Sequence, residues 1–103
     1  NNIFAKILRG EIPCNAIDED EYTLSFADIN PQAPIHILVI PKAAYLDNCS
    51  LVLLLLVAQK IAVEENLEDG FRMVINNGPN GGESVPHLHV HLLGGRKLNW
   101  PPG

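Results

Sequence analysis

Three histidines alternate with apolar residues in the segment His87-Leu88-His89-Val90-His91-Leu92-Leu93. Successive side chains of a β-strand point to opposite faces, whereas a helix would scatter the three rings around its axis. The β-branched Val90 and the Gly94-Gly95 pair after Leu93 also favour a strand. We therefore predict a strand over residues 87–93 that presents three imidazoles on one face and directs Leu88, Val90 and Leu92 to the other.

The rest of the chain supplies four more predicted strands and two predicted helices. The main helix is predicted over residues 51–67, which are rich in Leu and Ala. Strands are predicted over residues 15–18, 22–28, 35–40 and 71–76. The strand over residues 35–40 is almost continuously apolar, so we expect it to be covered on both faces. A short helix is predicted after its candidate N-cap Asn2 and before Gly10, with one apolar face formed by Ile3, Phe4, Ile7 and Leu8.

These elements predict a single α+β domain over residues 1–103. Its five-stranded sheet should be mostly antiparallel, because the strands follow one another across short connections and the helix over residues 51–67 is the one long crossover. The first half of that helix, residues 51–58, is apolar all round. Two alternatives explain this: burial within the monomer's own core, or burial against a partner subunit.

Composition and charge exclude several classes of protein. With 47% hydrophobic and 18% charged residues the chain is expected to fold, and its net charge of -5 argues against a general nucleic-acid surface. The longest apolar run, residues 51–58, is shorter than the roughly 20 residues of a membrane span, and no secretory signal is expected at the N-terminus. Cys14 and Cys49 form no CxxC pair. We expect reduced thiols in a cytoplasmic protein with no nucleic-acid or membrane partner.

The row of imidazoles has three explanations: a structural row, a metal site or a reactive face. A purely structural row would cost free energy unless each buried ring had a partner, although for His36 alone a structural role is expected. Neutral imidazole is a common zinc ligand, so a metal site is the serious rival. Imidazole is also a nucleophile near neutral pH when one ring nitrogen is bare and an acceptor holds the N–H of the other.

The loop before the histidines favours the reactive face. Gly78, Gly81 and Gly82 let the backbone approach an anion, and Asn76 and Ser84 add neutral donors beside them. The chain has no GxxxxGK[ST] phosphate loop and no GxGxxG fingerprint, so kinase-like and dinucleotide-oxidoreductase functions lose their usual support. The loop and the histidines together predict phosphoryl chemistry.

The segment over residues 87–93 resembles the motif His-φ-His-φ-His-φ-φ, with φ apolar, of the histidine triad (HIT) superfamily of nucleotide hydrolases and transferases. Other segments resemble its Hint branch, the histidine triad nucleotide-binding proteins or purine nucleoside phosphoramidases. The resemblance implies a homodimer in which two five-stranded sheets join and the main helices pack at the interface. The segments that carry it cover residues 3–7, 10–13, 26–34, 36–42, 81–82, 93–96 and 100–103.

The resemblance implies cleavage of the P–N bond of purine nucleoside 5'-phosphoramidates, such as those of AMP or GMP, to a nucleoside monophosphate and an amine, without a cofactor or metal. It implies that His89 attacks the phosphorus to form a nucleotidyl-histidine, that His91 hydrogen-bonds the phosphate, and that His87 and His36 support them. Asp28 would accept the ribose hydroxyls. The implied purine slot consists of Ile3, Phe4, Ile7, Phe26 and Ile29, and the implied phosphate and leaving-group contacts are Asn76, Gly82, Ser84 and, from the other subunit, Trp100.

Two other functions stay open: dinucleoside polyphosphate hydrolysis, as in the fragile-histidine branch of the superfamily, and nucleotide binding with vestigial catalysis.

The sequence also departs from the family pattern in two places. Between Lys42 and Leu51 it is several residues shorter, through a trimmed loop or missing residues, so the start of the main helix is expected anywhere from Asn48 to Leu51. Pro86, directly before the triad, removes one ladder donor, which the first position of a strand tolerates.

Overall fold

The structure is a computed structural model that describes residues 2–42 and 48–103. It confirms the predicted fold class, an α+β domain with one short helix, one long helix and a five-stranded sheet. Within the described residues no helix is long and apolar enough to cross a membrane. The elements in chain order are α1 (Ile3–Leu8), β1 (Ala16–Glu19), β2 (Thr23–Ala27), β3 (Ile35–Pro41), α2 (Asn48–Glu64), β4 (Phe71–Val74), a 3-10 turn η1 (Pro79–Gly81) and β5 (Val90–Gly94).

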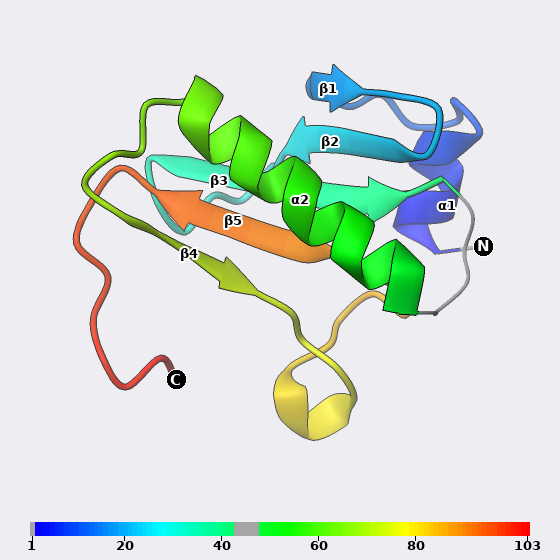
Figure 1. The fold of residues 1–103 in the computed structure, drawn as a ribbon. Helices are drawn as coiled ribbons and strands as arrows, with labels where there is room; N and C mark the ends of the chain where they lie inside the picture. The colour runs from blue at the N-terminus through cyan, green and yellow to red at the C-terminus, as the bar shows by residue number, and fades with distance from the viewer. Residues whose placement is uncertain (1, 43–47) are drawn as a thin grey trace.

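The strands form one sheet in the order β1-β2-β3-β5-β4, and each neighbouring pair is antiparallel. The strand β3 lies in the middle, where it pairs with β2 on one side and with β5 on the other. The chain leaves β3, crosses the sheet through α2 and returns as β4 at the edge (Figure 1). The antiparallel sheet and the single crossover were both predicted.

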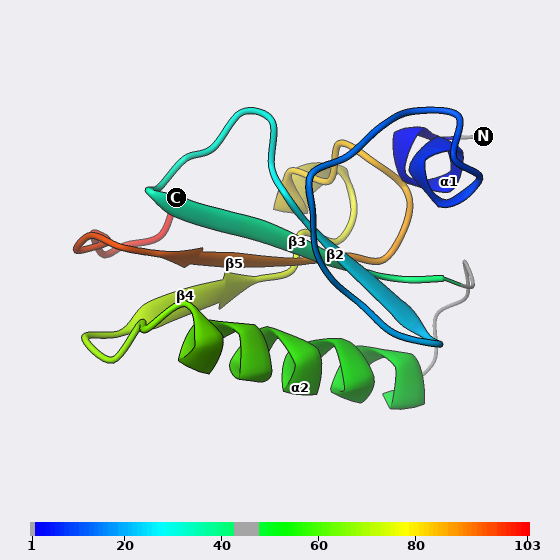
Figure 2. The same ribbon diagram turned by 90° about the horizontal axis from the view of Figure 1, so that it is seen from above.

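The two helices lie on opposite faces of the sheet (Figure 2). One apolar cluster lies between α2 and the sheet and includes Ile37, Val39, Val90 and Leu92 from the strands. A second cluster lies on the α1 face and includes Phe4, Leu24, Phe26, Leu38 and Ile40. Because neighbouring residues of β3 enter different clusters, this strand is buried on both faces, as its continuous apolar sequence predicted.

The helix α2 buries only one of its two apolar faces within the monomer. Leu54, Ala58 and Ile61 are fully buried against the sheet, at 0% exposure. On the outward face Val52, Leu56 and Val63 are exposed by 54%, 62% and 68%. These three residues, separated by four and seven positions, form one stripe along the helix. The monomer's own core therefore covers one side of this apolar helix and leaves the stripe of Val52, Leu56 and Val63 uncovered.

The strand of the histidine motif is shorter than predicted. It begins at Val90, so His91 lies in the ladder while His87 and His89 precede it. Pro86 has no N–H to donate, and the N–H of His87 donates to the Val85 carbonyl at 2.8 Å, which bends the chain there. The prediction of a strand from residue 87 was wrong, and the cause is the proline that stands before it.

Other boundaries shift by a few residues. The helix α2 begins at Asn48, within the predicted range, and ends at Glu64, before Asn66 with its positive φ of 59°. The strand β4 ends at Val74 rather than at residue 76. Most of the segment predicted to be shorter than the family pattern, residues 43–47, lies outside the described residues.

Candidate functional site

All four histidines of the chain meet on the face of the sheet opposite α2. The ring centroids of His89 and His91 lie 5.0 Å apart, and those of His36 and His91 lie 5.1 Å apart. His36 comes from β3 and His91 from β5, which pair side by side. The intervening residues Leu88, Val90 and Leu92 belong to the cluster beneath α2. The predicted division of faces is therefore confirmed, even though the regular strand starts late.

The short helix α1 covers the histidines through Phe4. The Phe4 ring lies edge-on to His89 at a centroid distance of 4.9 Å and to His87 at 5.9 Å. Asn2 caps the helix as predicted, because its Oδ1 accepts the Ala5 N–H at 2.9 Å. His87 and His89 are each only 4% exposed. The imidazoles thus lie in an environment that water reaches poorly.

The hydrogen bond of His89 defines which of its nitrogens is reactive. Its Nδ1 lies 2.6 Å from the His87 carbonyl oxygen, and a carbonyl can only accept, so Nδ1 carries the proton. In the neutral ring Nε2 is then bare. His89 is therefore held as the tautomer that offers an unprotonated Nε2, which is the form a nucleophilic imidazole needs.

A second chain of contacts defines the tautomers of His36 and His91. The backbone N–H of Gln32 donates to His36 Nδ1 at 3.0 Å, so the proton of the neutral His36 ring is on Nε2. His36 Nε2 lies 2.8 Å from His91 Nδ1, and it donates there. His91 therefore carries its own proton on Nε2. That nitrogen is buried and has no hydrogen-bond partner among the described residues, so a donor is left for a ligand.

The pKa values favour neutral rings at three of these positions. Burial lowers the pKa of His36, against the opposing effect of the Asp28 carboxylate. Burial also lowers the pKa of His87, although the Pro41 carbonyl, 3.4 Å from its Nε2, opposes this. The pKa of His91 falls to about 4, through burial first and then through repulsion from the neighbouring histidines. At neutral pH these rings act through the tautomers given above rather than as cations.

Asp28 lies at the end of β2, next to His36. Its Oδ1 accepts the Asn30 N–H at 2.8 Å, and its Oδ2 lies 3.5 Å from His36 Nε2. The second distance exceeds that of a good hydrogen bond, so the carboxylate acts on His36 mainly through its charge. The carboxylate is half-buried and keeps acceptor capacity for a polar ligand.

Asp28, His36 and His91 also form the group that comes nearest to a metal site in the described part of the chain, with one ligand atom from each within 4.8 Å of the others. Zinc binds the bare nitrogen of an imidazole. At His36, however, the Gln32 N–H occupies the Nδ1 lone pair, so Nε2 carries a proton and has no lone pair to give. The donor set as it is arranged fits a chain of proton donors and acceptors and does not fit zinc.

The residues of the implied purine slot divide into a buried floor and an exposed rim. Phe4 and Phe26 are buried and pack edge-on at a centroid distance of 5.8 Å, and Ile7 packs against the same cluster. Ile3 and Ile29 are exposed by 40% and 92%. The structure therefore brings Phe4, Ile7 and Phe26 together in one cluster and leaves Ile3 and Ile29 exposed.

The residues implied to contact the phosphate and the leaving group are only partly brought together. Asn76 lines a pocket of about 450 Å³ together with His36 and His91. Gly82 and Ser84 are exposed in the loop that rises from β4 on the α1 side of the sheet (Figure 2). Trp100 is 79% exposed, and the Arg72 guanidinium lies 6.0 Å from the centre of its ring.

The sequence did not indicate the backbone groups that hold the imidazoles. The Gln32 N–H, the Pro41 carbonyl and the His87 carbonyl each contact a ring nitrogen. A backbone N–H or carbonyl exists at nearly every position, so residue type gives no signal for these contacts. Only the fold, which places Gln32 and Pro41 beside the rings, identifies them.

Comparison with known proteins agrees with this geometry. A family model for the HIT domain matches residues 9–98. The "14 kDa zinc-binding protein" of Zea mays is 53% identical over 113 residues, covering 98% of this chain and 87% of that protein. The alignment with this relative spans 113 positions, whereas the chain has 103 residues. The chain therefore lacks some residues that the relative has within the matched region. "Adenylylsulfatase HINT1" of Arabidopsis thaliana is 48% identical over 113 residues, covering 98% of this chain and 76% of that protein.

A solved structure gives the same result for the fold. The crystal structure of a HIT family hydrolase from Legionella pneumophila Philadelphia 1 superposes with a TM-score of 0.92 at 45% sequence identity and covers all of both chains. The family match spans most of the chain, and the relatives exceed 30% identity over nearly all of it. The chain belongs to the histidine triad (HIT) family, in its Hint branch.

Proposed function

We propose that the protein is a nucleotide-binding hydrolase that cleaves the P–N bond of purine nucleoside 5'-phosphoramidates. The observation that carries this proposal is the pair of tautomers at the centre of the site. His89 offers a bare Nε2 because the His87 carbonyl holds its Nδ1 proton, and His91 offers an N–H at Nε2 because His36 donates to its Nδ1. A bare nitrogen beside a donor is the arrangement that attack on a phosphoryl group requires.

The reaction proceeds in two displacements at the α-phosphorus. In the first, the lone pair of His89 Nε2 forms a bond to phosphorus while the bond to the amine breaks, and the amine leaves with a proton taken from the solvent side. In the second, water attacks the phosphorus, the electron pair returns to His89 Nε2, and water releases a proton that balances the first. The N–H of His91 donates to a phosphoryl oxygen in both steps and stabilises its developing charge.

The remaining residues of the site bind and orient the nucleotide. The purine covers Ile3 and Ile29 above the Phe4 and Phe26 floor, where burial of apolar area supplies the affinity. Asp28 accepts the two ribose hydroxyls, which suits a carboxylate that the Asn30 N–H already orients. The phosphate and the leaving group are bound by Asn76, Gly82 and Ser84.

The test of this function is hydrolysis of adenosine 5'-phosphoramidate by the wild type and by His89→Ala. The wild type should release AMP, and the variant should lose turnover while it still binds AMP in a calorimetric titration. Arg9→Met, which changes an exposed side chain paired with Glu11, serves as the control for an ordinary surface substitution. Unchanged turnover in His89→Ala would remove His89 from the role of nucleophile. Tight AMP binding by a wild type that hydrolyses no phosphoramidate would support a binding module instead.

A second candidate reaction is cleavage of adenylyl sulfate. The Arabidopsis thaliana relative, 48% identical, is named an adenylylsulfatase. The same attack by His89 on the α-phosphorus would then release sulfate in place of an amine. Diadenosine polyphosphates would present a third leaving group to the same nucleophile. Values of kcat/KM on the three substrates decide between these reactions, and we expect the phosphoramidate to give the largest.

We also propose that the protein acts as a homodimer. The exposed stripe of Val52, Leu56 and Val63 on α2 supports this, because a partner helix would bury it. The strand β4 lies at the edge of the sheet, where a strand of a second copy could pair with it. In such a dimer Trp100 of one subunit would reach the leaving-group side of the other.

A further inference from the structure

The loop between β2 and β3 holds His36 from outside the histidine motif. The backbone N–H of Gln32, in this loop, donates to His36 Nδ1 at 3.0 Å. This bond leaves the His36 proton on Nε2, from which it is donated to His91. The His91 donor at Nε2 therefore depends on where the Gln32 peptide group points.

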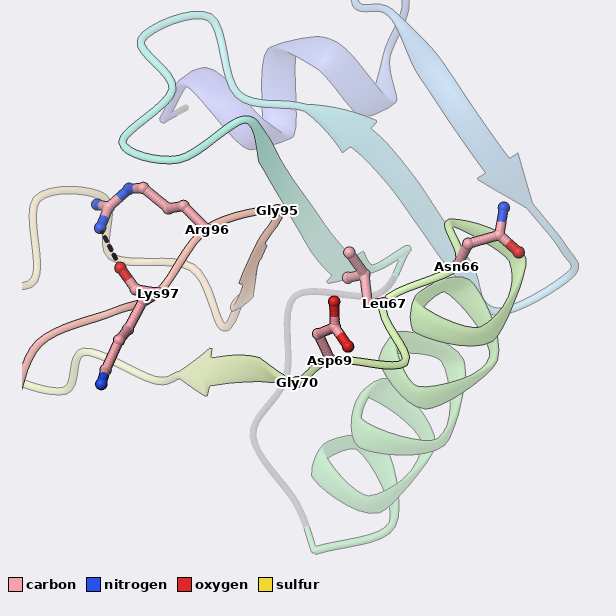
Figure 3. Close-up of a pocket in the computed structure, with 7 residues that line it drawn as sticks. All are labelled: Asn66, Leu67, Asp69, Gly70, Gly95, Arg96 and Lys97. Atoms are coloured by element: carbon pink, nitrogen blue, oxygen red, sulfur yellow. Dashed lines mark hydrogen bonds between the residues drawn. The ribbon is translucent and has the colours of Figure 1, made fainter.

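Arg96, which follows β5, holds the Gln32 carbonyl. This carbonyl belongs to the peptide unit that joins Gln32 to Ala33, one Cα away from the unit that carries the Gln32 N–H. Arg96 Nη2 donates to the Gln32 carbonyl at 2.7 Å, and Arg96 Nη1 donates to the Lys97 carbonyl at 3.0 Å. Figure 3 shows the second bond, with the Arg96 side chain pointing away from Asp69; both residues line a pocket of about 460 Å³. One guanidinium therefore connects the end of the motif to a loop that lies 64 residues earlier in the sequence.

The close contact between these two segments is built into the backbone. Gly95 has a φ of +90°, which favours glycine, and a Cβ at this position would lie 2.9 Å from the Pro34 Cβ. A larger residue would push the loop and the segment after β5 apart. The glycine thus lets Arg96 reach the Gln32 carbonyl across a short gap.

We propose that Arg96 is a positioning residue of the site: by holding the Gln32 carbonyl it fixes the backbone conformation of Gln32, so that the Gln32 N–H keeps His36 in the Nε2–H tautomer. Without the guanidinium the backbone of Gln32 is free to change its φ and ψ angles, its N–H can turn away from His36 Nδ1, and the His36 proton can move to that nitrogen. His91 Nδ1 must then carry a proton to donate to His36, so His91 Nε2 becomes bare. The lone pair of this bare nitrogen would then face the lone pairs of a phosphoryl oxygen, and the two atoms would repel each other.

Asp28 does not replace this contact. Its Oδ2 also favours a proton on His36 Nε2, but the distance of 3.5 Å is longer than a good hydrogen bond. The ribose hydroxyls further compete for the same carboxylate under the proposed function. The Gln32 N–H is the direct contact to the ring, and Arg96 fixes the same residue through its carbonyl.

The primary test measures the tautomer itself. In ¹⁵N-histidine-labelled protein, long-range ¹H–¹⁵N spectra distinguish a bare ring nitrogen from a protonated one. We expect the wild type to show His36 with a bare Nδ1 and a protonated Nε2, and Arg96→Met to show the two nitrogens averaged. Arg96→Lys should restore part of the wild-type signal, because an ammonium can still donate to the Gln32 carbonyl. Arg9→Met, the matched arginine control, should leave the His36 signals unchanged.

The kinetic test rests on the proposed function. Loss of a donor to a phosphoryl oxygen lowers kcat by roughly 10²–10³-fold, and Arg96→Met, which only disorders that donor, should lower kcat by about tenfold with KM nearly unchanged. Gln32→Pro, which deletes the N–H itself, provides a second variant if Arg96→Met does not fold. An unchanged His36 tautomer in Arg96→Met, or in Gln32→Pro where Arg96→Met does not fold, would overturn the proposal. A wild type inactive on phosphoramidates would overturn the proposed function and leave the tautomer result to decide the role of Arg96.

Discussion

His36 Nε2 lies 2.8 Å from His91 Nδ1, and this contact joins the middle strand β3 to the histidine motif on β5. It makes the last histidine of the motif a donor toward the ligand. The bond between His89 Nδ1 and the His87 carbonyl makes the middle histidine an acceptor, or nucleophile, on the same side of the sheet. The three alternating rings therefore differ in chemistry because each meets a different neighbour.

Replacement of His91 should separate binding from catalysis. His91→Ala removes the donor at Nε2, and we expect kcat on adenosine 5'-phosphoramidate to fall by roughly 10²–10³-fold, the range for loss of one donor to developing charge. Affinity for AMP should change by only a few-fold, because the purine and ribose contacts remain. Steady-state kinetics and calorimetry measure the two effects. A variant with wild-type kcat would show that the His91 N–H does not act on the transition state.

The stability of the fold should decrease as the solution becomes acidic. Folding lowers the pKa of His91 to about 4, so between its ordinary range and that value the unfolded chain binds more protons than the folded one. The free energy of unfolding therefore falls as pH falls through this window, and His36 and His87 act in the same direction. Urea unfolding at about pH 7.5 and about pH 5 should differ by on the order of 1–2 kcal/mol.

His91→Asn provides the control for this pH dependence. The variant has no proton to gain at position 91, so its unfolding free energy should fall less steeply toward acid than that of the wild type. Equal slopes for the two proteins would assign the acid sensitivity to other groups.

Gly95→Ala should destabilise the fold. The residue has a φ of +90°, and the new Cβ would lie 2.9 Å from the Pro34 Cβ. The left-handed conformation alone costs an alanine roughly 1–2 kcal/mol, which shifts Tm by about 4–8 °C per kcal/mol in a domain of this size. Gly81→Ala is the matched control, because its Cβ would meet only an ordinary contact at 3.9 Å. Equal melting temperatures for the two variants in a thermal scan would contradict the close approach of the two segments.

The exposed stripe on α2 should determine the oligomeric state. Leu56 is 62% exposed, and Leu56→Glu would place a charge in an interface between two copies of this helix. We expect the wild type to elute at twice the mass of one chain and the variant at the mass of one chain, as measured by size-exclusion chromatography with light scattering. Lys6→Glu on α1, on the other side of the sheet, should leave the dimer intact. A monomeric wild type would argue that the stripe has a different partner.

Removal of metal should leave hydrolysis unchanged. The Gln32 N–H occupies the Nδ1 lone pair of His36, so the cluster with Asp28 and His91 does not fit zinc as arranged. Protein treated with a chelator and freed of zinc should retain its full kcat on adenosine 5'-phosphoramidate. If activity disappeared with the metal and returned on addition of zinc, the proposed mechanism of a nucleophilic histidine would have to give way to one based on a metal site.

The sequence predicted the fold well because its patterns are local. The alternation of His87, His89 and His91 with apolar residues identified the face on which the rings lie, and Asn2 identified the start of α1. The start of β5 at Val90 was not predicted, because a strand pattern does not include the bend at Pro86 or the side-chain bond of His89 to the His87 carbonyl. The strand predicted from this pattern therefore extended too far toward the N-terminus.

The chemistry of the site was less accessible from sequence than its location. The tautomers of His36 and His91 depend on the Gln32 N–H, and Arg96, 64 residues away along the chain, contacts the carbonyl of the same residue. Such contacts form only when β3 and β5 pair, and they involve backbone groups that every sequence contains. The residue types of the motif indicate which rings gather at the site, and the fold indicates which nitrogen of His36, His89 and His91 carries the proton.

The late start of β5 divides the motif into a part inside the ladder and a part that precedes it. His91 is held by the ladders of β3 and β4 on its two sides, whereas His89 lies one residue ahead of the first ladder pair at Val90. A nucleophile must approach phosphorus from about 3–3.5 Å to bonding distance and then retreat. Under the proposed function, His89 would make that excursion without breaking a ladder pair, while His91, the proposed donor to the phosphoryl group, would stay within the sheet.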